Sequence, residues 1–148
     1  ECGLRAGTEN TASIVGMAVA LEKNCNNIRA NEQHIRSLES TLLSMLNSAG
    51  LRYIRNGSSR TLPGNVSLSF PNVTGEMLLH RMDLQGICIS TGSACDSVNT
   101  QISHVIQAIR VPEEFAEGTI RISLGKDNTK DEVHQIAKAL TEIILNQV

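Results

Sequence analysis

The stretch Thr119-Ile120-Arg121-Ile122-Ser123 alternates apolar and polar side chains at every step. The same alternation runs through residues 65–70, and Pro71 ends it. A period of two is typical of a β-strand with one buried face. Two shorter apolar runs, at 51–54 and 87–90, are further strand candidates. Together these stretches predict a small, mainly antiparallel sheet.

Helical periodicity flanks the strands. A long helical region is expected to begin near Thr11, after a polar opening that contains two glycines, and to stop at Gly50. Its apolar pattern weakens over residues 24–27, which predicts a kink or a break there and leaves the continuity of the two halves open. The N-terminal part is therefore expected to be two long helices or one interrupted helix.

Three later segments carry signals of helix starts. Thr74 offers an N-cap to an apolar stretch that follows it. A helix is plausible over residues 103–109, and residues 129–132 fit a capping box ahead of a clearly amphipathic run. The sum predicts an α+β fold, with a short, mainly antiparallel sheet covered by helices and preceded by long N-terminal helices.

Composition limits the classes of function. The chain of 148 residues suits one domain, or one domain and a small extension, and its formal net charge is −2. This charge gives no basic field for nucleic acid, and aromatic residues at 2% give no platform for base stacking. There is no apolar run of membrane-spanning length and no signal-peptide pattern, so a cytoplasmic protein is expected. The four cysteines form no CxxC pair and have no His at finger spacing, which predicts no zinc site. Without a secretory signal, their thiols are expected to be reduced.

Cys95 is the cysteine whose surroundings favour reactivity. Small residues on both sides, at 92–94 and 97, would leave its thiol exposed and mobile. A structural cysteine more often sits among aliphatic residues, as Cys88 does between two isoleucines. The alternative for Cys95 is a small residue in a surface turn.

Arg121 and Thr8 are the other candidates. Arg121 lies mid-strand, with its side chain on the face opposite its isoleucine neighbours, where it could hold a carboxylate with two parallel hydrogen bonds. The alternative is a solvated or salt-bridged strand residue. Thr8, at the end of Arg5-Ala6-Gly7-Thr8, could offer its hydroxyl to a phosphate near a helix start. The histidines are better explained as structural or solvated, with His104 the most interesting because it follows the Cys95 segment.

Four motifs in register carry a resemblance to a known family. Residues 3–10 follow the pattern G-x-R-x-G-T-x-N, and residues 90–95, Ser-Thr-Gly-Ser-Ala-Cys, are close to S-S-G-S-A-C. Residues 103–105 read S-H-V, and residues 120–125 follow I-R-x-S-L-G. In sequence, order and spacing these motifs resemble those of the NifS/IscS-type cysteine desulfurases, which are pyridoxal-phosphate enzymes of the class V aminotransferase family and fold type I. The agreement extends over essentially the whole chain.

The resemblance implies a role for each candidate residue. Cys95 would take the sulfur of L-cysteine as a persulfide, leaving alanine, and pass it to an acceptor or iron–sulfur scaffold protein. Arg121 would bind the carboxylate of the substrate. Thr8 would donate to the phosphate of pyridoxal 5′-phosphate, commonly that of the neighbouring subunit of a homodimer. No direct nucleic-acid or membrane partner is implied.

One departure from the family matters more than the matches. The family needs a lysine that forms a Schiff base with the cofactor. None of the four lysines here lies in its S-x-H-K setting. The chain is therefore expected to be the C-terminal portion of such an enzyme. Residues 1–27 would be the end of the large domain with a connecting helix, and 28–148 the small domain. Alone, it is expected to bind no cofactor and to be inactive.

Two other readings remain open at this point. The chain could be a non-enzymatic persulfide carrier or interaction module that uses Cys95 without a cofactor. It could also be a fragment kept only as a fold, and its apolar surface over residues 14–21 would then favour self-association.

Overall fold

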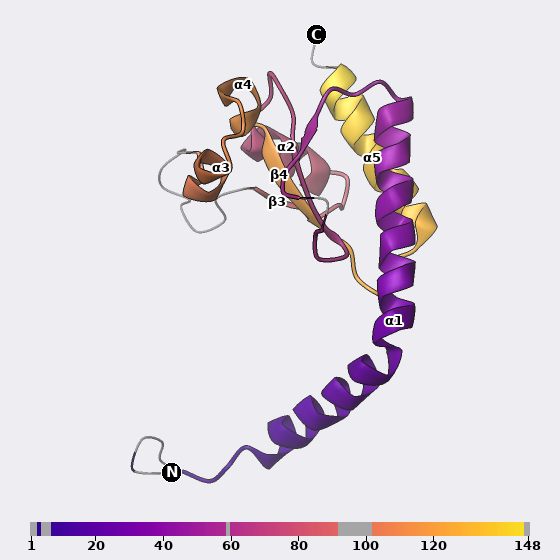
Figure 1. Cartoon of the computed structure of the whole chain (residues 1–148), viewed down its shortest axis with the longest axis vertical. Helices are drawn as coiled ribbons and strands as arrows, with labels where there is room; N and C mark the ends of the chain where they lie inside the picture. The colour runs from indigo at the N-terminus through magenta and orange to yellow at the C-terminus, as the bar shows by residue number, and fades with distance from the viewer. Residues whose placement is uncertain (1–2, 4–6, 59, 92–101, 147–148) are drawn as a thin grey trace.

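A four-stranded antiparallel sheet lies at the centre of the fold in the computed structural model (Figure 1), which describes residues 3, 7–58, 60–91 and 102–146. The strands follow the order β1-β2-β4-β3 across the sheet, and every neighbouring pair is antiparallel. The elements in chain order are α1 (Thr11–Ser48), β1 (Ile54–Arg55), β2 (Asn65–Ser69), α2 (Gly75–Asp83), β3 (Ser90–Thr91), α3 (His104–Ala108), α4 (Glu113–Ala116), β4 (Thr119–Ser123) and α5 (Lys130–Leu145). The predicted α+β class is confirmed.

The two central strands have one apolar face and one polar face. Val66 pairs with Ile122 and Leu68 with Ile120, and all four side chains are buried. This face packs against α1, α2 and α5, and the shared core includes Leu38, Leu42, Leu46, Leu78, Met82, Val133 and Leu140. The opposite face carries Ser67 and Arg121. The apolar face of the sheet is therefore the one that the alternation in the sequence predicted.

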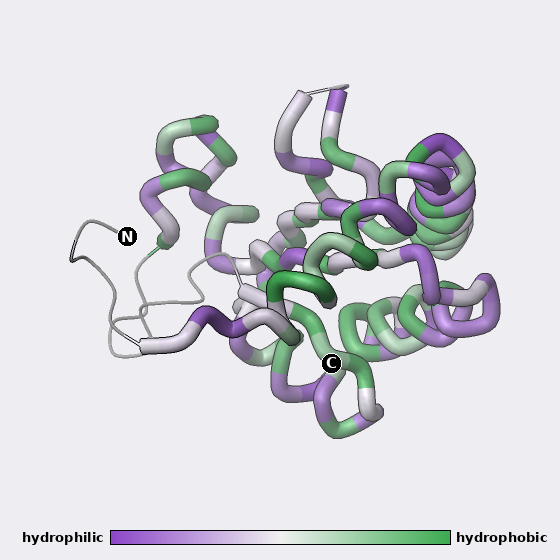
Figure 2. The backbone as a smooth tube through the Cα atoms, turned by 90° about the horizontal axis from the view of Figure 1, so that it is seen from below, coloured by the Kyte–Doolittle hydropathy of each residue, from purple (hydrophilic) through white to green (hydrophobic). Residues whose placement is uncertain are grey.

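Helices lie on both sides of the sheet. Figure 1 shows α1 and α5 side by side on one side, with α3 and α4 on the other. Hydrophobic and hydrophilic residues interleave along the helical coils in Figure 2, the pattern of helices with one buried stripe. Phe115 of α4 and Ile106 of α3 are buried outside the main core cluster. The polar face of the sheet is thus partly covered and partly open.

Helix α1 is continuous where the sequence allowed a break. It runs unbroken through residues 24–27, and Asn27 Nδ2 donates to Lys23 O at 2.8 Å. The Asn27 side chain therefore hydrogen-bonds to a carbonyl of its own helix and does not end the helix. Figure 1 shows the helix bending between a packed half and a half that projects from the body. The expected division between residues 27 and 28 falls inside this helix and stays a prediction.

Two predicted strands are shorter than expected, for the same physical reason. The segment 51–54 contributes only its last residue to β1, because Leu51 N donates to Leu46 O at 3.2 Å and closes the end of α1. The segment 87–90 contributes only Ser90 to β3, because Ile87 N donates to Met82 O at 3.0 Å and closes α2. Backbone groups used to terminate a helix are not free for a sheet ladder.

Cys88 and α4 differ from the sequence expectation. Cys88 is exposed, whereas Ile87 and Ile89 on either side of it pack against the core. Reading it as a buried structural cysteine was wrong, because alternate side chains of an extended segment point to opposite sides. Helix α4 was not predicted, since a single turn is too short to show helical periodicity.

The capping box of α5 is present as predicted. Glu132 N donates to Thr129 Oγ1 at 3.2 Å, and Thr129 N donates to Glu132 Oε2 at 2.8 Å. The backbone hydrogen bond from Thr129 is the main cause that lowers the pKa of Glu132. Because the carboxylate is the favoured form in the folded state, its contribution to stability is present above the ordinary glutamate pKa and is lost as the pH falls through the lowered value.

Thr129→Ala is expected to lower the free energy of unfolding by about 1 kcal/mol, because the N-terminal amides of α5 lose an acceptor. Urea unfolding at neutral pH measures the change. Thr141→Ala is the control: Thr141 Oγ1 bonds to Ala137 O inside the same helix, where no orphan amide depends on it. Equal losses in the two variants would contradict a capping role.

Candidate functional site

The structure places two of the three predicted site residues. Arg121 lies in the middle of β4, and Thr8 lies just ahead of α1. Cys95 lies outside the described residues, so its role stays a prediction. Figure 1 shows the N-terminal end of the chain far from the sheet, so the fold does not bring Thr8 near Arg121.

Arg121 sits between two serines on the polar face of the sheet. It pairs with Ser67 of β2 on one side and with Ser90 of β3 on the other. Directly opposed residues of antiparallel strands point to the same face, so the three side chains form one row. Arg121 Nη2 donates to Ser90 Oγ at 3.3 Å, and the arginine is exposed. A guanidinium held at the open part of a polar face can accept an anionic group from solvent.

The same row connects Arg121 to the cysteine motif. Ser90 is both the cross-strand partner of Arg121 and the first residue of the segment that ends at Cys95. The motifs at 90–95 and 120–125 are therefore joined by a hydrogen bond between two residues that are 31 positions apart in the chain. Sequence reasoning named both motifs without predicting this pairing.

A buried polar chain lies beside the row and was missed from the sequence. Asn56 Nδ2 donates to Ser67 Oγ at 3.1 Å and to Ser69 Oγ at 2.8 Å. Ser69 and Thr119 share a hydrogen bond of 2.7 Å, and Thr119 Oγ1 donates to Ala116 O at 2.8 Å. Polar residues at alternate positions of a strand signal a polar face, but nothing in the sequence marks Asn56 as their partner.

The histidines take structural or surface positions. His34 Nε2 lies 2.9 Å from Asn128 O and connects α1 to the loop ahead of α5. His80 lies 3.7 Å from Glu76 on the surface of α2, and His104 is exposed at the start of α3. Within the described ranges, no three His, Cys, Asp or Glu side chains gather closely enough to hold a metal ion.

All four lysines are exposed. Lys23 is on the projecting half of α1, and the others are on α5 or the loop that precedes it. Lys126 and Lys138 pair with Asp127 at 2.7 Å and Glu142 at 3.8 Å. Lys130 and Lys138 are on α5, which packs against the apolar face of the sheet, opposite to the face that carries Arg121.

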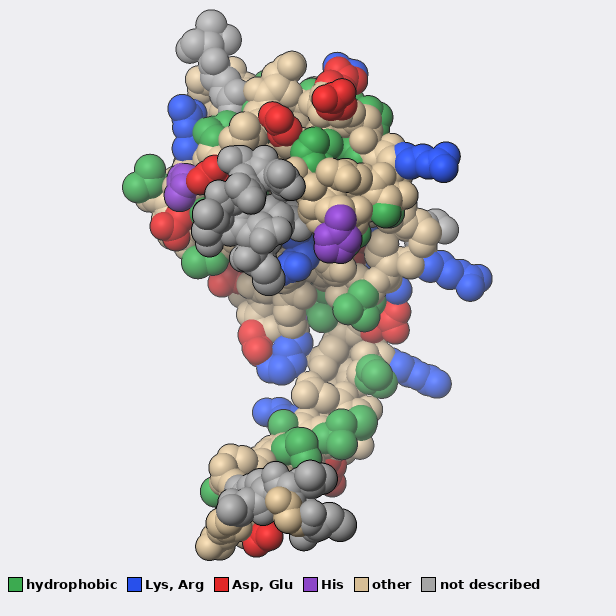
Figure 3. Space-filling model, turned by 90° about the vertical axis from the view of Figure 1, so that its left-hand side faces the viewer, with side chains coloured by type: hydrophobic (Ala, Val, Ile, Leu, Met, Phe, Trp, Pro, Cys, Tyr) green, Lys and Arg blue, Asp and Glu red, His purple; other side chains and the backbone are tan. Residues whose placement is uncertain are grey.

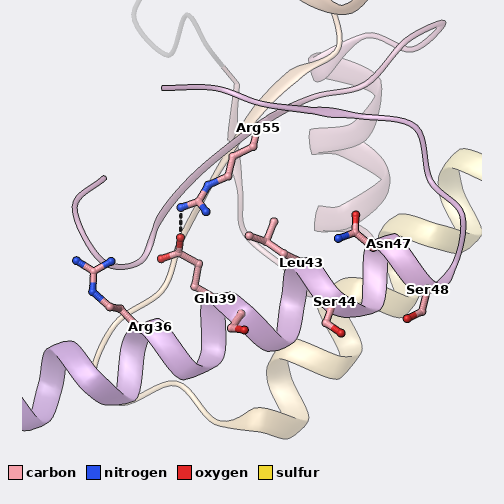
Figure 4. Close-up of a pocket in the computed structure, with 8 residues that line it drawn as sticks. Arg36, Glu39, Leu43, Ser44, Asn47, Ser48 and Arg55 are labelled. Carbon is pink, nitrogen blue, oxygen red and sulfur yellow. Dashed lines mark hydrogen bonds and ion pairs between the residues drawn. The ribbon is translucent and has the colours of Figure 1, made fainter. Parts of the chain in front are cut away.

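A separate polar hollow lies between α1 and β1 (Figure 4). It encloses about 510 Å³ and is lined by Arg36, Glu39, Ser40, Leu43, Ser44, Asn47, Ser48 and Arg55. Glu39 is buried, forms an ion pair with Arg55, and accepts from Gly64 N at 3.3 Å. These contacts of the Glu39 carboxylate, to Arg55 and Gly64, hold α1 to the neighbouring segments, so we treat the hollow as a structural feature and not as a binding site.

The projecting half of α1 exposes several apolar side chains. Figure 3 shows hydrophobic groups gathered on this arm below the body. They are Ile14, Val15, Met17, Val19, Leu21 and Ile28, with Met17 at 67% exposure. The surface that the sequence predicted over residues 14–21 is thus exposed in the isolated chain. Among the helices of the described part, none combines the length and apolar character needed to span a membrane.

Known proteins similar to this chain fall in one group. The model of the aminotransferase class-V family matches residues 1–136. A cysteine desulfurase IscS of Clostridium botulinum is 40% identical over 147 residues, which cover 97% of this chain and 37% of that protein. The cysteine desulfurase NifS of Azotobacter vinelandii is 32% identical over 148 residues, covering 97% of this chain and 36% of its own length.

Solved structures agree with the sequence matches. A NifS-like protein superposes with a TM-score of 0.80 at 36% identity, over 97% of this chain and 36% of that one. The chain therefore spans a little over a third of the length of the relatives it matches. The fold, the four motifs and the Ser67–Arg121–Ser90 row lie within the matched part.

Proposed function

This chain belongs to the aminotransferase class-V family, and from that premise we propose that it is the C-terminal portion of a cysteine desulfurase. Such an enzyme converts L-cysteine to L-alanine and transfers the sulfur to a cysteine of the protein. The observation that carries the proposal is the row on the polar face of the sheet. It joins Arg121, a candidate for the substrate carboxylate, to the first residue of the motif that contains Cys95.

Arg121 would bind and orient the carboxylate of the substrate cysteine. Its side chain projects from a central strand whose other face is locked into the core by Ile120 and Ile122. A guanidinium on so rigid a base keeps its direction, which favours two parallel hydrogen bonds to a carboxylate. Among the described residues its side chain bonds only to Ser90, which leaves the remaining N–H donors for a ligand.

Cys95 would accept the sulfur. The thiolate of Cys95, having lost its proton, would attack the sulfur of the substrate. The S–S bond would form as the Cβ–S bond breaks, and the electron pair of that bond would stay with the β-carbon, which takes a proton and ends as the methyl group of alanine. The persulfide would then pass to an acceptor or iron–sulfur scaffold protein. The proposed role of Cys95 needs a free thiol, and free thiols persist in a reducing compartment, so we propose a cytoplasmic location.

Pyridoxal 5′-phosphate fits the residues of this chain only in part. Thr8 could donate its hydroxyl to the phosphate, in a homodimer to that of the neighbouring subunit. The four lysines, however, are exposed, and none lies in the S-x-H-K setting that the resemblance requires. We therefore expect the lysine that holds the cofactor to come from polypeptide outside these 148 residues, and the chain alone to release no sulfide from cysteine.

A chimera tests the proposal directly. This chain would replace the matching 147 residues of the Clostridium botulinum IscS, which is 40% identical to it. The chimera is expected to release sulfide from L-cysteine in the presence of a thiol reductant, and Cys95→Ser is expected to abolish that release because a serine hydroxyl cannot take the sulfur. Cys88→Ser is the matched control, since Cys88 is an exposed cysteine outside the motif. A chimera that binds the cofactor yet releases no sulfide would refute the proposal.

An experiment on the isolated chain distinguishes a portion of an enzyme from a sulfur carrier. After incubation with a small-molecule persulfide donor, mass spectrometry would show whether one sulfur atom is added at Cys95. Sulfur uptake by the chain together with an inactive chimera would support the carrier alternative. Uptake together with an active chimera would support the desulfurase.

A further inference from the structure

One arginine joins two consecutive residues of α4 to a distant part of the chain. Arg52, in the connection between α1 and β1, donates from Nη2 to Glu114 Oε1 at 2.9 Å. Its guanidinium carbon also lies 4.9 Å from the centre of the Phe115 ring. The ion pair uses the edge of the planar guanidinium, and the ring contact uses its face. Because the two contacts go to neighbouring residues of one helical turn, together they fix the orientation of that turn.

Helix α4 is part of a strap (residues 102–118, which include α3) on the side of the sheet opposite α1 and α5 (Figure 1). At its C-terminal end the strap is bonded directly to the sheet, where Phe70 N donates to Gly118 O at 3.1 Å. Over residues 102–115, Glu114 is the only residue with a hydrogen bond to a described residue outside the strap. The middle of the strap is therefore held by the partner of Glu114, Arg52, and by the burial of apolar side chains.

The turn between α3 and α4 needs such support. Arg110 adopts the left-handed region, with a φ of 57°, although it is not a glycine. This backbone conformation is unfavourable for a residue with a side chain, and it persists where the surrounding structure holds it in place. Ile106 before the turn and Phe115 after it are both buried, outside the main core cluster. Arg52 adds a polar contact on the α4 side of the turn.

The strap borders the row that contains Arg121. Thr119 Oγ1 donates to Ala116 O at 2.8 Å, so the end of α4 lies beside Thr119. Thr119 pairs with Ser69 of β2. Arg121, two positions later, pairs with Ser67 of the same strand. Side chains two positions apart in a strand are neighbours on one face. The strap is therefore next to Arg121 on the polar face of the sheet.

The other end of the strap follows the cysteine motif in the chain. Helix α3 begins one residue after Ser103, whose Oγ accepts from Val105 N at 3.3 Å. The S-H-V of residues 103–105 is thus the start of a helix, and it is the motif to which no chemical role has been given. It follows Cys95, and the strap leads from it to the strand that carries Arg121. The described elements on either side of the segment that contains Cys95 are therefore β3 and the strap.

We propose that Arg52 is a positioning residue, which holds the strap on the polar face through Glu114 and Phe115 and so fixes the C-terminal attachment of the segment that carries Cys95. The proposal rests on the function proposed above and adds a residue that touches neither substrate nor sulfur. Sulfur transfer needs the Cys95 thiolate at the substrate while Arg121 holds the carboxylate. A displaced strap would disturb the first condition and leave the second, because β4 is paired on both of its edges.

Amide hydrogen exchange of the labelled whole chain measures how firmly Arg52 holds the strap. Arg52→Leu is expected to speed exchange of the Phe115 and Ala116 amides, which are bonded within the strap, about 10-fold. The amide of Leu140, in the part of α5 buried in the main core, is expected to keep its rate. Arg60→Leu is the matched control, at an exposed arginine in the loop ahead of β2. Unchanged strap rates in Arg52→Leu, or equal acceleration at Leu140, overturn the proposal.

A charge reversal distinguishes the ion pair from the side-chain volume at position 52. Arg52→Glu places a carboxylate beside Glu114 and is expected to speed strap exchange more than Arg52→Leu does, because like charges repel. Adding Glu114→Arg restores an opposite pair and is expected to bring the rates to within about 3-fold of the unmodified chain. The remaining difference is the lost contact with the Phe115 ring. A double variant that exchanges as fast as Arg52→Glu would show that the ion pair does not hold the strap.

The chimera tests whether the position of the strap serves the reaction. Arg52→Leu in the chimera is expected to lower kcat for sulfide release about 5-fold and to leave KM for L-cysteine within about 2-fold. The reversed pair, Arg52→Glu with Glu114→Arg, is expected to recover most of kcat. An active chimera whose kcat is unaffected by Arg52→Leu refutes the positioning role and leaves the desulfurase standing. An unmodified chimera without activity refutes the desulfurase, and the exchange rates still decide whether Arg52 holds the strap.

Discussion

Arg121→Leu in the chimeric enzyme is expected to lower kcat/KM for L-cysteine by about 100-fold. The change removes the charged donor that would hold the substrate carboxylate. Arg121→Lys keeps the charge but loses the fork geometry, and a decrease of about 10-fold is expected. Initial rates of sulfide release over a range of cysteine concentrations give both values.

The fold should tolerate both changes at Arg121. The side chain is exposed and its one described hydrogen bond is to Ser90, so the melting temperature is expected to stay close to that of the unmodified chimera. Arg81→Leu is the control, because Arg81 is an exposed arginine on α2. A kcat/KM that survives Arg121→Leu, or falls as much with Arg81→Leu, would show that the carboxylate is held elsewhere.

The elements that the sequence predicted best are those whose signal is local. The strands β2 and β4 follow a period of two over five residues each, and the bounds of β4 agree with the predicted stretch 119–123. The start of α5 depends on side chains three positions apart, Thr129 and Glu132, and it too was predicted. In each case the residues that decide the structure are neighbours in the chain.

The parts that the sequence did not predict depend on distant partners. The short strands β1 and β3 are trimmed because Leu51 and Ile87 complete the ends of preceding helices. Asn56 meets Ser67 and Ser69 only once β1 and β2 pair. No local pattern records such meetings, because the register between strands is settled by the packing of the whole core.

The candidate site also has a part that local sequence predicts and a part that depends on distant partners. The outward direction of Arg121 could be predicted, because it follows from alternation along one strand. Its contact with Ser90 could not, since it needs the register of β3 on β4. The role of Cys95 came from a resemblance and stays a prediction until sulfur is found on it.

The ion pair between Glu39 and Arg55 is expected to be the charged contact whose loss most destabilises the fold. The Glu39 side chain is 6% exposed, on the packed half of α1, and it also accepts from Gly64 N just ahead of β2. Arg55→Met leaves this buried carboxylate without its cation and is expected to lower the free energy of unfolding by about 3–5 kcal/mol. Urea unfolding of the whole chain measures the loss.

The double variant Glu39→Met with Arg55→Met separates the pair from its burial. Removing both charges leaves no uncompensated carboxylate, so most of the stability lost in Arg55→Met is expected to return. Glu39 holds β1 from the α1 side, and the next residue after Arg55 is Asn56, which faces Ser67 on the other side of the sheet. A double variant that stays as unstable as Arg55→Met would show that the loss comes from packing around position 55 and not from the unpaired carboxylate.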